Sequence, residues 1–333
     1  MRTTTMMRSR RTTIGVVAMI LTGAIACRDT ANTPAASAGD TAVDTSTSRP
    51  KVALVMKSLA NEFFQTMEDG ARAHQEQNPT RYELFAEGIK DELDVVRQID
   101  LVEQMVARGA QVLVLAPADS KALVAAAAKA IEAGLTVVNI DNRLDEDALT
   151  ERGLTISFVG PDNRGGAAQA AEVLAKTLNP GDQVAIIEGA PGAFNAIQRR
   201  LGFEDAMNDA GVEIVASQSG YWEVDRANQV AAALLLAHPH LTALLCANDN
   251  MALGAVAAVR AAGKTDRVAI VGFDNISAVE TLVKDRSVLA TVDQHADQIA
   301  VNGIEHALAI LDGTQAPADV QTTVTLITAD TLQ

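Results

Sequence analysis

The sequence predicts an α/β protein with two lobes, each a doubly wound parallel sheet with helices on both faces. Three observations support this prediction. From Lys51 onward, short apolar runs alternate with longer stretches of helical spacing. Glycine follows several of the helical stretches, at the point where a helix would end. The 333 residues also exceed the length of one domain of about 150 residues.

The apolar runs predict strands that are buried on both faces. Each run is short and is bounded by polar turn residues, which is typical of strands inside a parallel sheet. In chain order the runs are Val52–Met56, Tyr82–Ala86, Val112–Ala116, Thr136–Ile140, Ile156–Val159, Val184–Ile187, Val212–Ser217, Leu244–Cys246, Val268–Phe273 and Leu289–Val292.

The segments between these runs predict helices. They are Phe64–Gln77, Glu92–Arg108, Lys121–Ala133, Gly166–Leu178, Ala196–Ala210, Ala227–Ala237, Met251–Ala262 and Ala296–Leu311. Gly134, Gly211 and Gly263 directly follow three of them, where glycine commonly ends a helix. A repeated order of strand, helix and strand predicts parallel sheets, because each helical crossover returns the chain to its starting direction.

A break near residues 160–162 divides the folded part into two halves of about 120 residues each. One doubly wound sheet of ten strands is possible, but two sheets of five or six strands fit the length better. Ligands of such sheets bind outside the carboxyl ends of the strands. Two facing lobes therefore predict a cleft, lined by the residues that directly follow the strands.

Composition excludes several classes of protein. Apolar residues make up 48% of the chain, which is enough for a sizeable core. The net charge of −15 argues against a surface that binds nucleic acid, because phosphate contacts need clustered cations. Two cysteines are too few for a disulfide scaffold.

Residues 1–26 predict an export signal. Four arginines precede an uninterrupted stretch of apolar or small residues from Ile14 to Ala26. At about 1.5 Å per residue, this stretch is too short to cross a hydrocarbon core of about 30 Å as a helix. A buried N-terminal helix is the alternative interpretation.

The sequence around Cys27 resembles a bacterial lipobox, although Ala24 stands where leucine is usual. The resemblance implies that Cys27 is the lipid-modified first residue of the mature protein. Loss of residues 1–26 would leave a net charge of −19, since four arginines and no acid are removed. Residues 27–50 hold almost no large apolar side chain, so we expect a flexible tether. Cys246 would then have no partner and is expected to be an inert buried thiol.

The residues that follow the strands predict a site for a polyhydroxylated ligand such as a sugar. A sugar offers hydroxyl groups that donate and accept, with apolar C–H faces between them. The candidates are the donors Lys57 and Arg199, the acceptors Asp141 and Asp274, the amides Asn61, Asn248 and Gln294, and the aromatic residues Phe63, Phe64 and Trp222. Taken singly, Arg199 could be a solvated helix residue and Asp274 a helix cap, and either phenylalanine could belong to the core. Their joint position after strands favours a binding site.

The sequence offers no comparable case for catalysis. No phosphate-binding loop, metal-ligand spacing or set of nucleophile, base and orienting group is found among its motifs. We therefore expect a binding protein with no cofactor and no metal. An enzyme with an α/β cleft is the weaker alternative.

Six segments share one resemblance. They are Val52–Phe64, Val138–Asp141, Val184–Gly189, Cys246–Gly254, Val271–Asp274 and Ala290–Gln294. Together they resemble the ribose/allose-type periplasmic sugar-binding proteins, which are solute receptors of ABC importers with the type I two-lobe fold. The resemblance implies a three-strand hinge, with crossovers near Pro161, after Gln294 and near Thr323. It thus implies an N-lobe of residues 51–161 plus 295–323 and a C-lobe of residues 162–294 plus 324–333.

The resemblance also implies a function. The family's sugar contacts fall on the ten candidate residues, so we expect a monosaccharide or related polyol to bind in the interlobe cleft by hinged closure. Lys57 is the allose-like residue where ribose binders have serine, and Asn142 stands where they have arginine. Phe194 and Asn195 replace small residues beside the pocket. A six-carbon sugar, an inositol or a sugar alcohol is therefore expected at least as readily as ribose.

The expected partners are the permease subunits of an ABC importer and, through the lipid anchor, a membrane. We expect the protein to be a monomer and to lie at the periplasmic or other extracytoplasmic face. A receptor that presents its ligand to a chemosensor or sensor kinase would use the same cleft, and this alternative stays open. Transcriptional repressors that share the fold carry an N-terminal helix-turn-helix. This chain has the predicted export signal in that place, so we expect no nucleic-acid partner.

Overall fold

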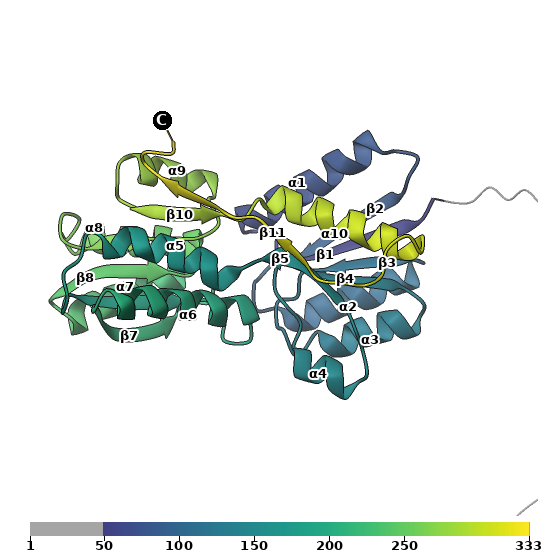
Figure 1. Ribbon diagram of the computed structural model, residues 1–333, viewed down its shortest axis with the longest axis horizontal. Coiled ribbons are helices and arrows are strands. Elements are labelled where there is room, and N and C mark those ends of the chain that lie inside the picture. The colour runs from purple at the N-terminus through teal and green to yellow at the C-terminus, as the bar shows by residue number, and fades with distance from the viewer. Residues whose placement is uncertain (1–48, 333) are drawn as a thin grey trace, which may run out of the picture. The chain divides into compact units, whose positions relative to one another are not determined.

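The computed structural model describes residues 49–332. Within this range, two six-stranded sheets form the centres of two lobes, which we call the N-lobe and the C-lobe (Figure 1). This is the fold class that the sequence predicted.

The N-lobe sheet has the strand order β11-β5-β4-β3-β1-β2, and all its neighbouring strands run parallel. Its strands are β1 (Lys51–Ser58), β2 (Glu83–Ile89), β3 (Val112–Leu115), β4 (Thr136–Ile140), β5 (Ser157–Pro161) and β11 (Val320–Thr322). Helices α1 (Glu62–Gln77) and α10 (Ala296–Leu311) pack together over one face. The other face carries α2 (Val95–Ala107) and α3 (Val124–Glu132), with the short α4 (Glu146–Glu151) beside them (Figure 1).

The C-lobe sheet has the strand order β12-β10-β9-β8-β6-β7. Its strands are β6 (Gln183–Glu188), β7 (Glu213–Ser219), β8 (Leu241–Cys246), β9 (Ala269–Val271), β10 (Ala290–Asp293) and β12 (Thr325–Thr328). Its helices are α5 (Asn163–Ala175), α6 (Phe194–Asp209), α7 (Val224–Ala237), α8 (Asp249–Ala261) and α9 (Ser277–Lys284). Helix α5 packs against α6 and α7 packs against α8, while α9 lies near β12.

Strand β1 shows why the apolar runs are continuous. Val52, Leu54 and Met56 belong to the hydrophobic core that includes α1 and α10. Ala53 and Val55, which point to the opposite face, belong to the core under α2 and α3. All five side chains are fully buried, so the strand needs apolar residues at every position and not at every second one.

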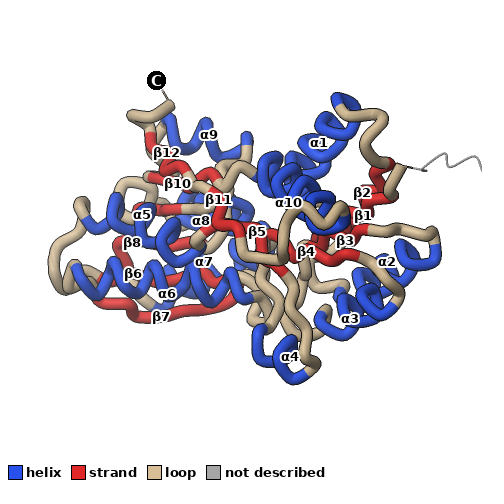
Figure 2. Tube along the Cα trace, turned by 45° about the vertical axis from the view of Figure 1, so that its right-hand side comes forward, coloured by secondary structure: helices blue, strands red, loops and turns tan. Residues whose placement is uncertain are grey.

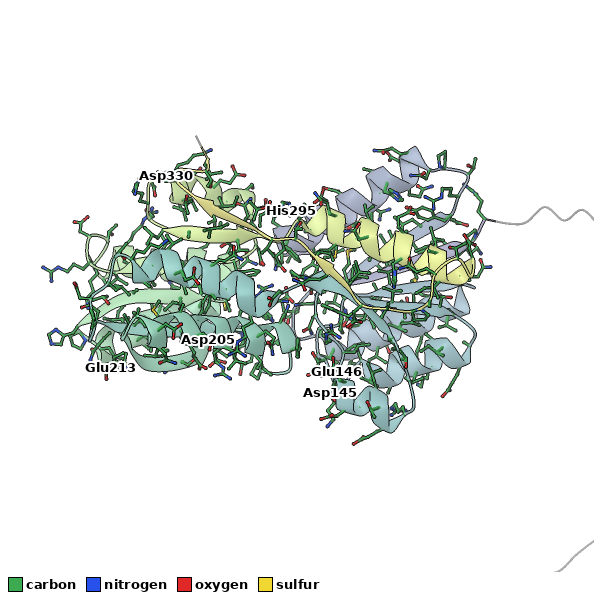
Figure 3. All side chains as sticks on the ribbon, viewed as in Figure 1. Asp145, Glu146, Asp205, Glu213, His295 and Asp330 are labelled. Atoms are coloured by element: carbon green, nitrogen blue, oxygen red, sulfur yellow. The ribbon has the colours of Figure 1, made fainter. Side chains whose placement is uncertain are left out.

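The chain passes between the lobes three times. The first crossing joins β5 to α5 at Asp162, whose side chain caps α5, and the second joins β10 to α10 at Gln294 and His295 (Figure 3). The third joins β11 to β12 at residues 323–324 (Figure 2). These crossings form the predicted three-strand hinge.

All ten predicted strands are present, and the structure adds β11, β12 and the short helices α4 and α9. Gly134, Gly211 and Gly263 end their helices with φ values of 91°, 68° and 65°, as predicted. The expectation of wholly parallel sheets was wrong at β12, which pairs with β10 in the antiparallel direction. Strand β11 runs parallel to β5 and towards the C-lobe, and the chain enters the C-lobe directly from β11, at the edge where β10 ends, so β12 runs against β10.

One local prediction also needs correction, and one alternative interpretation is excluded. Helix α2 begins at Val95 and not at Glu92, because the side chain of Asp94 caps it by accepting from the backbone N–H of Arg97 at 3.1 Å. Glu92 therefore lies in the preceding loop. For Asp274 a helix cap was the alternative interpretation, and it does not hold, since the residue before α9 is Ile276.

The predicted export signal, Cys27 and the tether up to residue 48 lie outside the described residues. Among residues 49–332, no helix has both the length and the apolar character that a membrane crossing requires.

Candidate ligand-binding site

Twelve side chains from both lobes line a narrow pocket at the carboxyl ends of the two sheets. They are Lys57, Asn61, Phe63, Phe64, Glu92, Asp141, Asn195, Arg199, Trp222, Asn248, Asp274 and Gln294. The structure thus brings all ten candidate residues together and adds Glu92 and Asn195.

Asn61 fixes one wall of the pocket and the start of α1. Its Oδ1 accepts from the backbone N–H of Phe63 at 3.1 Å, and its Nδ2 donates to Oε1 of Glu92 at 3.3 Å. The capped first turn of α1 holds Phe63 and Phe64, whose rings pack edge to face at 5.1 Å. Both rings are buried, so this wall offers apolar surface beside polar groups.

Lys57 lies between two carboxylates. Its Nζ is 3.9 Å from Oε2 of Glu92 and 3.8 Å from Oδ2 of Asp141. The same ammonium group lies 5.2 Å from the ring centroid of Phe64 and 5.1 Å from that of Trp222. Burial raises the pKa of Glu92 to about 7, although the nearby Lys57 acts in the opposite direction.

Arg199 organises the wall that the C-lobe contributes. Its Nε donates to Oδ1 of Asn163 at 2.8 Å, and its Nη1 donates to the carbonyl oxygen of Ala247 at 2.8 Å. Nη1 also lies 3.2 Å from Oδ1 of Asp274, which accepts from Nε2 of Gln294 at 2.6 Å. Burial raises the pKa of Asp274 to about 6, opposed by the charge of Arg199. The centre of this wall is therefore a buried, hydrogen-bonded ion pair of Arg199 and Asp274.

Three pocket residues have left-handed backbone conformations directly after strands or their turns. The φ angles are 60° at Asp141, 70° at Trp222 and 119° at Asp274. Residues other than glycine rarely adopt such backbone angles. Each costs about 1–3 kcal/mol, and they concentrate at functional sites. At Asp274 the backbone is held by its N–H, which donates to the carbonyl of Val292 at 2.8 Å. These turns aim the three side chains into the gap between the lobes.

The indole ring of Trp222 lies against the backbone of Gly189, at the end of β6. A Cβ atom on this glycine would come within 2.1 Å of indole Cζ2 and Cη2. We expect Gly189→Ala to displace the ring at a cost of about 1–3 kcal/mol in stability. Trp222 is the single tryptophan of the chain and is 3% exposed, so its emission should shift to the red in this variant. An unchanged emission spectrum would contradict the packing described here.

Several buried polar atoms of the pocket have no hydrogen-bond partner among residues 49–332. They are Oε2 of Glu92, Oδ2 of Asp141, Oδ1 of Asn195, Nε1 of Trp222 and Oε1 of Gln294. Unpaired buried polar atoms are costly, and each one in a native protein needs an explanation. Four of these five are acceptors, so the pocket suits a ligand that offers several hydroxyl donors.

A set of direct hydrogen bonds joins the lobes beside the pocket, and we call it the interlobe latch. The backbone N–H of Ser120 donates to the carbonyl of Gly192 at 2.9 Å, and its Oγ accepts from the N–H of Phe194 at 2.9 Å. The N–H of Asn195 donates to Oδ1 of Asn142 at 3.1 Å. Asn142 thus forms a contact between the lobes and does not line the pocket.

Sequence reasoning missed Glu92 as a pocket residue. Strand β2 continues to Ile89, beyond the predicted end at Ala86, so the loop that follows starts later than expected. Had the strand been extended, Glu92 would have stood among the residues after a strand, which is the signal that identified the others. Asn195 was expected beside the pocket and lies in its wall.

No group of three or more Asp, Glu, His or Cys side chains among residues 49–332 is placed to hold a metal ion. Cys246 is buried in β8, and burial raises the pKa of its thiol, as expected for an unreactive core residue.

Comparison with known proteins agrees with this geometry. Residues 52–315 match the family model described as periplasmic binding protein domain. The chain is 55% identical over 286 residues to the D-ribose/D-allose-binding protein of Pseudomonas aeruginosa, covering 84% of this chain and 89% of that protein.

Two solved structures are also similar. One is an ABC transporter solute-binding protein from Burkholderia multivorans, with 53% identity and a TM-score of 0.82, covering 84% of this chain and 99% of the other. The second is an ABC transporter periplasmic solute-binding protein from Actinobacillus succinogenes 130z with bound D-allose, with 34% identity and a TM-score of 0.80, covering 85% and 99%. On the extent of these matches and the two-lobe fold, the chain belongs to the periplasmic binding protein family.

Proposed function

We propose that this chain is the extracytoplasmic solute-binding protein of an ABC sugar importer and binds a monosaccharide or related polyol in the pocket. The observation that carries the proposal is the set of five unpaired buried polar atoms, contributed by both lobes, that face one small space. A neutral polyol satisfies such atoms with its hydroxyl groups, and its C–H faces fit the buried rings of Phe63, Phe64 and Trp222.

The ligand class follows from the residues that line the pocket and from the relatives. The pocket is lined by buried charged, amide and aromatic side chains, a combination that suits a small polyhydroxylated ligand. The Pseudomonas relative is described as binding D-ribose and D-allose, and the Actinobacillus structure holds D-allose. D-Allose and D-ribose are therefore the first probes, followed by inositols and sugar alcohols.

The ten candidate residues and the two additions have complementary roles in this proposal. Lys57, Arg199 and the amide groups donate to ligand oxygens, and the carboxylates accept from ligand hydroxyls. Several hydrogen bonds to charged groups at about 1.5–3 kcal/mol each, less the ordering costs, can supply the roughly −8 kcal/mol of micromolar binding. No chemical change of the ligand is involved, so it should be released unchanged.

The binding mechanism that we propose is hinged closure. The pocket lining is divided between the N-lobe and the C-lobe, and three short crossings connect them. A ligand contacts both walls only in the closed form, so it binds this form more tightly than the open one. The difference between the two affinities determines how far the ligand shifts the population towards closure. The closed form would then dock on the permease.

For the N-terminal part we propose that residues 1–26 are a signal peptide, and that lipidated Cys27 and a tether hold a monomeric receptor at a membrane. Cys27→Ala should release the protein from the membrane fraction. A ligand-presenting receptor for a chemosensor or sensor kinase is the alternative, and it differs in the docking partner and not in the pocket.

The emission of Trp222 tests the proposed function. The indole is buried, and its ring centroid lies 5.1 Å from Nζ of Lys57 and 5.5 Å from Cζ of Arg199. Titration with D-allose or D-ribose is expected to change its emission with saturation at micromolar concentrations, in agreement with calorimetric titration.

The matched control is Trp222→Phe, which keeps a ring in the pocket. It should lose the optical signal and retain a calorimetric one. Absence of heat and of optical change across pentoses, hexoses, inositols and sugar alcohols would refute the proposed function.

A further inference from the structure

Glu92 occupies one corner of the pocket together with Lys57 and Asp141. It is 5% exposed and comes from the loop between β2 and α2. One carboxylate oxygen, Oε1, accepts from Nδ2 of Asn61 at 3.3 Å. The other, Oε2, has no hydrogen-bond partner in the part of the chain that the structure describes, and Glu92 lines the pocket. The carboxylate is thus anchored on one side and unsatisfied on the other.

The spacing of this corner leaves room for one more oxygen atom. Nζ of Lys57 is 3.9 Å from Oε2 of Glu92 and 3.8 Å from Oδ2 of Asp141, which also lacks a partner. These separations are too long for direct hydrogen bonds, whose N···O distances are about 2.7–3.2 Å. A hydroxyl oxygen about 2.8 Å from Lys57 Nζ and from a carboxylate oxygen fits the same triangle. It would accept from the ammonium group and donate to the carboxylate.

An unpaired buried carboxylate oxygen lowers the stability of the fold. Removing a carboxylate from water is expensive, and an incompletely satisfied buried ion pair commonly destabilises the fold. A glutamine would keep the contact with Asn61 and avoid the buried charge. The presence of Glu92 therefore needs an interaction that only an anionic acceptor makes well.

We propose that Glu92 is a specificity-determining residue that accepts a hydrogen bond from one hydroxyl group of the ligand, in a hydroxyl subsite shared with Lys57. The subsite selects polyols that carry a hydroxyl at this corner over analogues that lack it. This inference rests on the proposed function, because it assigns a role within the same pocket.

The charges around Glu92 predict that ligand affinity depends on pH, which allows a second test of the proposal. Lys57 from β1 faces it as a cation, while Asp141 after β4 and Asp274 after β9 act as anions. Burial is the largest effect and raises the pKa of Glu92 to about 7. An ionised Glu92 is the stronger acceptor, so affinity should increase as the pH rises through about 7. Asp274, with a pKa raised to about 6, adds a separate step at lower pH.

The experiment compares the wild-type protein with Glu92→Gln by calorimetric titration of D-allose, D-ribose and the monodeoxy analogues of D-allose. Glutamine preserves size and the acceptor for Asn61, so folding should be retained, and the melting temperature checks this. We expect the affinity for D-allose to fall by about 10- to 100-fold. One deoxy analogue should bind both proteins with nearly equal affinity, because it lacks the hydroxyl that Glu92 would hold.

The pH series and a control complete the test. From pH 6 to pH 8, wild-type affinity for D-allose should rise by up to about tenfold, and Glu92→Gln should lose the step near pH 7. The control is Glu87→Gln on β2, whose side chain is 44% exposed and pairs with Arg108. It should match the wild type in every titration.

The outcomes separate the two proposals. Sugar binding by the wild type with less than a twofold loss in Glu92→Gln would overturn the role of Glu92 and leave the proposed function intact. So would a loss that is the same for D-allose and for every deoxy analogue. If the wild type binds neither D-allose nor D-ribose nor any other polyol of the panel, the proposed function fails and the role of Glu92 fails with it.

Discussion

Asp274→Ala is expected to weaken the binding of D-allose by about 30- to 900-fold, or roughly 2–4 kcal/mol. The substitution removes a buried acceptor from the pocket. It also removes the partner of Arg199 Nη1 at 3.2 Å and of Gln294 Nε2 at 2.6 Å, so two donors lose their fixed orientation. Calorimetric titration measures the loss directly.

The control for this variant is Asp205→Ala. Asp205 lies on α6 at the surface of the C-lobe (Figure 3), is 47% exposed and pairs with Arg164. Exposed ion pairs contribute about 0–1 kcal/mol, and this one is remote from the pocket lining. An Asp274→Ala protein that binds within threefold of the wild type would remove Asp274 from the proposed site.

Arg199→Met is expected to affect both stability and binding. Methionine fills much of the space, but the change leaves Asp274 as a buried carboxylate without its cation. Breaking a buried pair in this way costs about 3–5 kcal/mol of unfolding free energy. It also removes the donors to Asn163 and Ala247, both at 2.8 Å. Denaturant unfolding should show the loss of stability, and D-allose should give no measurable heat.

Arg164→Met is the matched surface variant, because Arg164 is 49% exposed and forms its ion pair with Asp205 in solvent. Its stability should change by no more than about 1 kcal/mol. If Arg199→Met were as stable as Arg164→Met, the network around Arg199 would not support the C-lobe wall as described.

Much of the fold could be predicted because the local signals agree with the tertiary structure. A strand such as β1 is buried on both faces, so its sequence is a continuous apolar run, and glycines with positive φ mark the ends of α3, α6 and α8. The strands β11 and β12 lack this signal. Their sequences, Val-Gln-Thr and Thr-Leu-Ile-Thr, are rich in β-branched residues, but each strand is short and half-buried or exposed, so neither forms a continuous buried apolar run. Their pairing depends on the hinge, which is a tertiary feature.

The candidate site was predictable for a related reason. In a parallel sheet the strand ends share one edge, so residues far apart in sequence, such as Lys57 and Asp141 of the N-lobe, are brought to one place by topology alone. Predicting that Glu92 lines the pocket would have required knowing where β2 ends and that this charged side chain is buried. Neither is encoded in a local pattern, because a glutamate near a helix start usually indicates a favourable exposed charge.

The interlobe latch has a consequence for how long a ligand stays bound. Its hydrogen bonds join protein to protein, so they favour closure by a fixed amount that is independent of which sugar occupies the pocket. In the proposed hinge motion, apparent affinity scales with the fraction of molecules already in the binding-competent form. Two receptors with identical pocket walls but different residues at Ser120 or Asn142 would therefore hold the same molecule for different times before releasing it to the transporter.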